Sequence, residues 1–182
     1  MDSHLKHIGS LEPLDQRHRE YGLMAAGTPL ADLRLGNPQA SWATAEIGGA
    51  LLVFRRDTVL KKQVSLHHHG HDIPLATFHA DMLCRGELQL GTALYYWRPV
   101  NKRWTQWSWQ TAEGHDVVSI KLRHGPIIMS GEVYASHSQP SPEQLQLILL
   151  GWYLLILNHQ PLGNHLAAGF DIYLGKLAGL RK

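Results

Sequence analysis

Short apolar runs separated by turn residues dominate the chain from residue 42 to residue 135. In the segment 118–123, apolar and polar residues alternate with a period of two, which buries one face of a strand and leaves the other in water. Runs at spacings of about ten residues with glycine-rich breaks are typical of a β-sandwich or a β-barrel. The pattern predicts strands at Trp42–Ile47, Ala50–Arg55, Val59–Leu66, Ile73–Leu83, Glu87–Trp97, Arg103–Thr111, Asp116–Arg123 and Ile127–Ala135.

The clearest local signal lies close to the C-terminus. Ser141 is followed by Pro142, Glu143 and Gln144, which places a capping hydroxyl, a first-turn proline and a capping-box glutamine in the order that starts a helix. The almost wholly apolar run 145–157 comes next, and Asn158 and prolines or glycines beyond it end the pattern. We therefore predict a helix over about 142–158.

This helix needs protein on every side. As a helix, the apolar run is about 20 Å long at 1.5 Å per residue, whereas a transmembrane helix needs about 20 apolar residues. A helix that is apolar all round and too short to span a bilayer is surrounded by protein. The expected fold is therefore mainly β with one buried C-terminal helix, in which an antiparallel barrel or a strongly curved sheet wraps around the helix.

The two ends of the chain show weaker patterns. Residues 1–40 are interrupted by glycine and proline, so we expect an irregular N-terminal arm, with a short helix over Asp15–Met24 as one interpretation. Residues 41–160 are expected to form the barrel and its helix. Residues 161–182 are expected to form a C-terminal extension on the surface.

Composition limits the classes of protein that fit. The chain has 182 residues, 44% hydrophobic and 18% charged, which is ordinary for a globular protein of one domain. Its net charge of +2, without a lysine- or arginine-rich block, disfavours general nucleic-acid binding. Cys84 is the single cysteine, and residues 1–7 are polar and unlike a secretory signal. These features predict a cytoplasmic protein without a transmembrane segment.

The order of short strands, tryptophan-rich hairpins and a final hydrophobic helix over 145–157 resembles the tubby C-terminal-like superfamily. That group includes the phospholipid scramblases and the LURP-one-related proteins, and the resemblance covers roughly residues 42–160. It implies a closed antiparallel barrel of about twelve strands around a buried C-terminal helix, and binding rather than catalysis. Scramblase activity and the family's lipid-contacting residues are not transferred to this chain.

A histidine cluster is the first candidate site. His67, His69 and His71 would project to one side of an extended segment, with Asp72 and His79 nearby, and imidazole is a common ligand for zinc and similar divalent metals. Such a site, if a position stayed open for water, would suit a metal-dependent hydrolase. The alternative interpretation is a solvated histidine-rich turn around Gly70 without a dedicated metal.

An aromatic and basic cluster is the second candidate site. Its rings would stack on a ligand or lie at a lipid interface, and its arginines would meet a phosphate. The alternative is that about half of the rings belong to the core. The predicted ligand-binding residues are Tyr96, Arg98, Arg103, Trp104, Trp107 and Trp109.

These features favour a non-catalytic binding or scaffold domain that contacts a lipid headgroup, a small ligand or a partner protein. The chain lacks a GxSxG elbow, a phosphate-binding loop, a GxGxxG turn and an HExxH helix. A metal-dependent enzyme using the histidine cluster is the alternative. A homo-oligomer in which the apolar helix packs between chains is a third arrangement.

Overall fold

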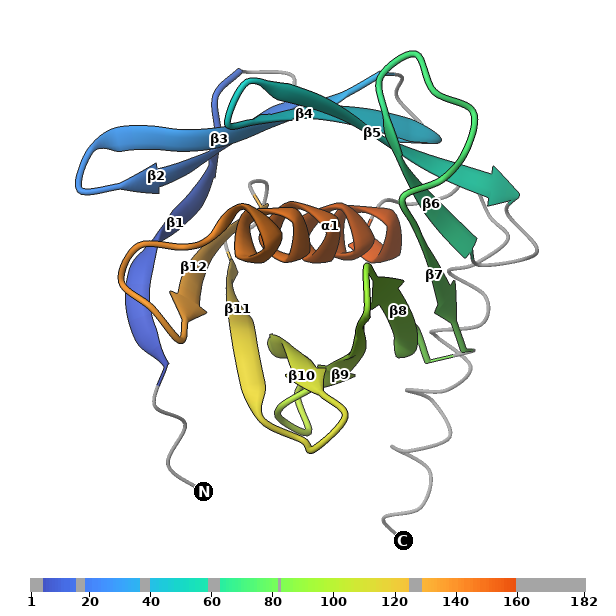
Figure 1. Ribbon diagram of the computed structural model, residues 1–182. Coiled ribbons are helices and arrows are strands. Elements are labelled where there is room, and N and C mark those ends of the chain that lie inside the picture. The colour runs from blue at the N-terminus through green and yellow to red at the C-terminus, as the bar shows by residue number, and fades with distance from the viewer. Residues whose placement is uncertain are drawn as a thin grey trace, which may run out of the picture.

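The computed structural model describes residues 5–15, 19–36, 40–58, 63–81, 83–124 and 129–159. In this part of the chain, twelve antiparallel strands close into a barrel, and one helix lies inside the ring of strands (Figure 1). The predicted fold class is confirmed.

The strands follow one another around the barrel in chain order, and β1 pairs with β12 to close it. Their bounds are β1 Lys6–Pro13, β2 Glu20–Ala25, β3 Thr28–Leu35, β4 Trp42–Ile47, β5 Ala50–Thr58, β6 Gln63–His68, β7 Ala76–Ala80, β8 Gly86–Leu90, β9 Ala93–Pro99, β10 Gln106–Thr111, β11 Asp116–His124 and β12 Met129–Ala135.

The N-terminal segment is where the sequence-based prediction was wrong. β1, β2 and β3 lie within residues 6–35, where an irregular arm was predicted, and residues 20–24 of the predicted helix over Asp15–Met24 belong to β2. Residues 16–18 lie outside the described residues. For β1 the reason is non-local: one of its two hydrogen-bonded neighbours, β12, comes from near the far end of the chain, with Lys6 opposite Ala135 and Leu11 opposite Gly131. The local pattern of apolar and polar residues does not reveal a strand partner that is so distant in sequence.

Several other strand limits also differ from the prediction. The single strand expected over Glu87–Trp97 is two strands, β8 and β9, joined by a tight turn at Gly91 and Thr92. The strand expected over Ile73–Leu83 is shorter, because 73–75 belong to the loop before β7. Residues 59–62 and 127–128 of two further predicted strands, and the predicted extension 161–182, lie outside the described residues.

The alternation predicted for β11 is confirmed for its inward face and, apart from Ser119, which is 1% exposed, for its outer face. Val118, Ile120 and Leu122 face inward and are buried, whereas Lys121 and Arg123 are exposed on the outer face. Because a strand's side chains alternate between its two faces, each strand of the closed sheet supplies one inner row to a common core.

The helix α1 (Pro142–His159) begins with the capping arrangement that the sequence predicted. The Gln144 backbone N–H donates to Ser141 Oγ over 3.2 Å, and the Ser141 N–H donates back to Gln144 Oε1 over 3.1 Å. This reciprocal pair satisfies two backbone donors that the first turn of a helix leaves without intrahelical partners.

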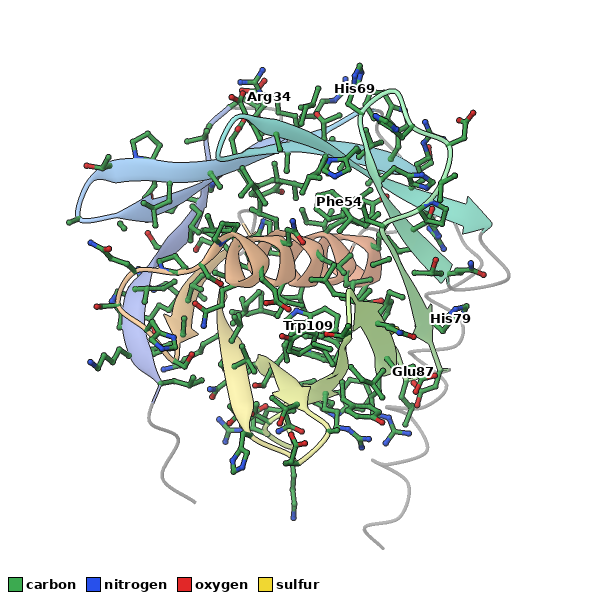
Figure 2. All side chains as sticks on the ribbon, viewed as in Figure 1. Arg34, Phe54, His69, His79, Glu87 and Trp109 are labelled. Carbon is green, nitrogen blue, oxygen red and sulfur yellow. The ribbon has the colours of Figure 1, made fainter. Side chains whose placement is uncertain are left out.

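The middle of α1 is the centre of the core. The non-glycine side chains from Leu147 to Ile156 are at most 6% exposed, so the helix is covered on all sides. Figure 2 shows Phe54 and Trp109 inside the ring on two different sides of the helix, while Arg34 and His69 lie outside. Within the described residues, no helix is both long enough and apolar enough to cross a lipid bilayer.

Gly151 lets two tryptophan rings approach the helix closely. A Cβ atom at this position would lie 2.9 Å from the Trp97 ring and 3.0 Å from Trp109 Nε1. Glycine lowers helix stability by about 1 kcal/mol relative to alanine, so its presence here is explained by the approach of the rings and not by helix propensity.

Within the described residues, hydrogen bonds join the helix to the strands and to the segment before β4. The Trp109 indole N–H donates to the Leu147 carbonyl over 2.7 Å, and the Tyr153 hydroxyl donates to the Ala40 carbonyl over 2.5 Å. The Tyr95 hydroxyl donates to Glu143 Oε1 over 2.7 Å. These bonds satisfy polar groups that burial would otherwise leave unpaired, and they fix the position of the helix along the barrel.

We expect the substitution Gly151→Val to destabilise the protein by about 1–3 kcal/mol, because a branched side chain overpacks the contact with Trp97 and Trp109. Chemical denaturation followed by tryptophan fluorescence measures this change. The exposed Leu94→Ala variant is the control and should change stability by less than about 0.5 kcal/mol. An unchanged midpoint for Gly151→Val would contradict the described packing.

Stability should fall as the pH rises from about 10 to about 12. Burial, and then the hydrogen bond and negative charge of Glu143, raise the pKa of Tyr95 to about 12, and burial also raises the pKa of Tyr153. In this interval the unfolded chain loses the phenol protons that the folded state keeps, so unfolding is favoured. Denaturation midpoints measured across this range should fall less steeply for Tyr95→Phe than for the unmodified chain. Equal slopes would contradict the raised pKa.

Candidate functional site

The β9–β10 hairpin contains most of the predicted aromatic and basic residues, and the register of its strands separates them into two sets. Trp97 lies opposite Trp109, and Arg98 lies opposite Ser108. Because neighbouring residues on a strand face opposite sides, the tryptophans point into the barrel, and Tyr96 and Arg98 point outward.

Trp107 and Trp109 belong to the core. They are 2% and 0% exposed, respectively. The Trp97 ring stacks on Trp107 with centroids 5.4 Å apart, and it lies 4.9 Å from the Trp109 centroid. The structure therefore places these two predicted ligand-binding residues beside the helix, away from any ligand that approaches from outside.

The outer face of β9 pairs an aromatic ring with a cation. The Arg98 guanidinium carbon lies 5.3 Å from the centroid of the Tyr96 ring, within the range of a cation–π contact. Tyr96 is half-buried and Arg98 is exposed. Glu87 on β8 is the register partner of Tyr96 and bounds this face on one side; its side chain lies outside the barrel (Figure 2).

A compact loop joins β9 to β10 and fixes the remaining predicted residues. The Asn101 side chain accepts the Thr105 backbone N–H over 3.0 Å and donates to Thr105 Oγ1 over 2.9 Å. The Trp104 N–H donates to the Asn101 carbonyl over 3.1 Å. Trp104 adopts a φ of 57°, a left-handed conformation uncommon for a residue with a side chain. These bonds stabilise the backbone from which Lys102 and Arg103 project.

Trp104 connects this loop to the core. Its ring packs edge-on against Trp107 with centroids 5.7 Å apart, and its carbonyl accepts the Trp107 indole N–H over 3.1 Å. Trp104 is half-buried, so part of the ring stays accessible next to the exposed Arg103. Asn101 was not among the predicted residues, although asparagine is a common turn residue and is the sequence signal for this loop.

We call Tyr96, Arg98, Lys102, Arg103 and Trp104 the basic hairpin surface. Within the described residues, no ion pair engages its three cations, whereas Arg34, Arg85 and Arg123 are each paired with a carboxylate. The Asp116 carboxylate accepts hydrogen bonds from two uncharged donors, Ser108 Oγ over 2.7 Å and Gln110 Nε2 over 2.9 Å, and within the described residues it forms no ion pair with these cations. The surface therefore presents positive charge that the described side chains leave unpaired.

The predicted metal ligands are divided between a buried strand position and an exposed loop. His67 lies on β6, is 5% exposed, and has its Nε2 atom 2.9 Å from Ser65 Oγ. His69 and His71 are exposed in the loop that follows β6. Among the described residues, no group of three or more histidine, cysteine, aspartate or glutamate side chains is placed to hold a metal ion. The structure thus does not bring these three imidazoles together.

No protein-family model, no curated protein and no solved structure matches this chain.

The division of the hairpin into core and surface predicts different effects of substitution. Trp109→Ala should destabilise the protein by about 3–5 kcal/mol, because it leaves a large cavity beside the helix. Arg103→Ala should change stability by no more than about 0.5 kcal/mol, because the side chain is exposed and makes no ion pair in the described part. Urea denaturation of both variants measures the difference. Similar losses for the two would contradict the assignment.

Proposed function

We propose that this chain is a non-catalytic binding or scaffold domain that contacts a phosphate-bearing lipid headgroup through the basic hairpin surface. The observation that carries the proposal is the group of three exposed cations, Arg98, Lys102 and Arg103, on one hairpin, without an ion pair in the described part. Unpaired cations on a rigid support favour binding of an anionic group.

The filled interior of the barrel is a reason to expect a binding site on its outside. The inward rows of the strands and the central part of α1 form one continuous buried cluster, so side chains fill the lumen. A ligand that contacts this domain therefore meets its outer face or its loops. The basic hairpin surface offers both aromatic and cationic groups on such a loop.

The chemistry of the surface suits phosphate. A guanidinium group offers several N–H donors in a fixed plane and forms charge-assisted hydrogen bonds with phosphate oxygens. Arg98 is oriented by the Tyr96 ring, and the Asn101 bonds hold the loop of Lys102 and Arg103. Because the groups are already ordered, binding requires less loss of conformational entropy. Val100, which is 47% exposed on the same loop, adds an apolar contact suited to a lipid interface.

The resemblance to the tubby C-terminal-like superfamily also supports this proposal. It implies a closed barrel of about twelve strands around a C-terminal helix, and the described chain has twelve strands and one helix in that arrangement. We propose on this basis that the domain is of the tubby-like type, and that it serves binding and not catalysis.

The experiment is vesicle flotation at low salt, with phosphatidylserine mixed into phosphatidylcholine. Each cation near an anionic membrane contributes about 1 kcal/mol, so the double variant Arg98→Gln/Arg103→Gln should partition roughly 20–30-fold more weakly. Arg34→Gln is the matched control, because it removes one arginine that pairs with Asp32 on β3. It should partition like the unmodified chain.

Two outcomes would contradict the proposal. One is equal partitioning of the double variant and the unmodified chain. The other is an absence of binding to phosphatidylserine vesicles when the chain is folded. The denaturation midpoint of the double variant should match that of the unmodified chain, which separates a lost contact from a lost fold.

A further inference from the structure

The turn after β6 places two histidine side chains next to each other. The His71 backbone N–H donates to the His68 carbonyl over 3.0 Å, and Gly70 has a φ of 79°, in the left-handed region that suits the third position of such a turn. The His69 N–H donates to the Leu51 carbonyl over 2.9 Å, which ties the turn to the neighbouring strand β5. One hydrogen bond within the turn and one to β5 therefore fix the backbone of this turn.

The two rings lie close to the separation that a shared metal ion requires. The ring centroids of His68 and His71 lie 6.0 Å apart with an interplanar angle of 67°. Two imidazoles that bind one tetrahedral zinc ion, each at about 2.0–2.1 Å, have centroids roughly 5 Å apart, so the two side chains reach a shared ion after a rotation that shortens the separation by about 1 Å. Both residues are exposed, so an ion reaches them without opening the barrel.

This pair differs from the set that the sequence pattern predicted. A period of two favours His67, His69 and His71, but β6 ends at His68 and the turn follows it. The turn brings its first and fourth residues together, while His67 stays buried on the strand beside Ser65.

We propose that His68 and His71 form a binding site for one divalent cation of the zinc, nickel and copper class. The two imidazole nitrogens are the protein ligands, and the remaining coordination positions are filled by water or by donor atoms of another molecule. Magnesium and calcium prefer oxygen ligands, so the site discriminates against them.

This site is separate from the basic hairpin surface. All neighbouring strands of the barrel are antiparallel, so the connection from β6 to β7 and the connection from β9 to β10 lie at opposite ends of the barrel. The metal site and the proposed lipid contact can therefore be tested independently of each other.

The experiment is a titration of the full chain, without an affinity tag, with zinc chloride in a buffer that does not coordinate metals. His68→Ala and His71→Ala should each weaken zinc binding on the order of a hundredfold. Once one imidazole holds the ion, the second is present at a high effective concentration, and a variant with a single imidazole loses that advantage. His69→Ala is the matched control, since it removes an exposed imidazole from the same turn. It should leave the affinity unchanged, and magnesium should give no binding.

A second measurement locates the ion among the 13 histidines of the chain. Copper(II) added well below one equivalent should broaden the NMR amide signals of residues 66–75 and of Leu51 before any others. Gly70→Val should weaken zinc binding although both imidazoles remain, because a branched residue disfavours a positive φ. The proposal is overturned if His69→Ala weakens binding as much as His68→Ala, or if other signals broaden first.

Discussion

The packing of one apolar helix inside a closed sheet is the constraint on which the rest of the structure depends. The helix α1 has apolar residues on all sides, and burial of such a surface is favourable only within a surrounding layer of protein. The barrel supplies that layer. The helix in turn fills the space inside the barrel that the inward-facing side chains of the strands do not occupy. Trp97, Trp109 and Trp152, all fully buried, complete the contact between helix and wall.

A filled interior determines where binding chemistry is found. The inward-facing side chains of each strand belong to the core, so the binding side chains that we propose lie on outward positions and on the loops at the two ends of the barrel. The β9–β10 hairpin shows both kinds of position: Trp109 on β10 packs against the helix, whereas Arg98 on the paired strand β9 is exposed on the outer face. The histidine turn at the other end follows the same rule.

The sequence predicted the elements whose causes are local. The helix and its capping box were predicted from Ser141 and Gln144, and the β-rich character from period-two alternation. It missed β1 because that strand depends on pairing with residues more than a hundred positions away, such as Ala135. In the candidate site, the sequence indicated that about half of the aromatic rings could belong to the core but did not say which ones. The prediction that His67, His69 and His71 lie on one side of a strand failed because a turn at Gly70 interrupts the alternation of side chains.

Native-state hydrogen exchange of the α1 amides tests the central claim most directly. If the helix is enclosed by the barrel, the amides of 150–156 exchange only when the whole domain opens. Their free energy of exchange then equals the global free energy of unfolding from denaturant titration. Exchange of these amides through a smaller, local opening, while the amides of β10 and β11 stay protected, would contradict the enclosed helix and the fold built around it.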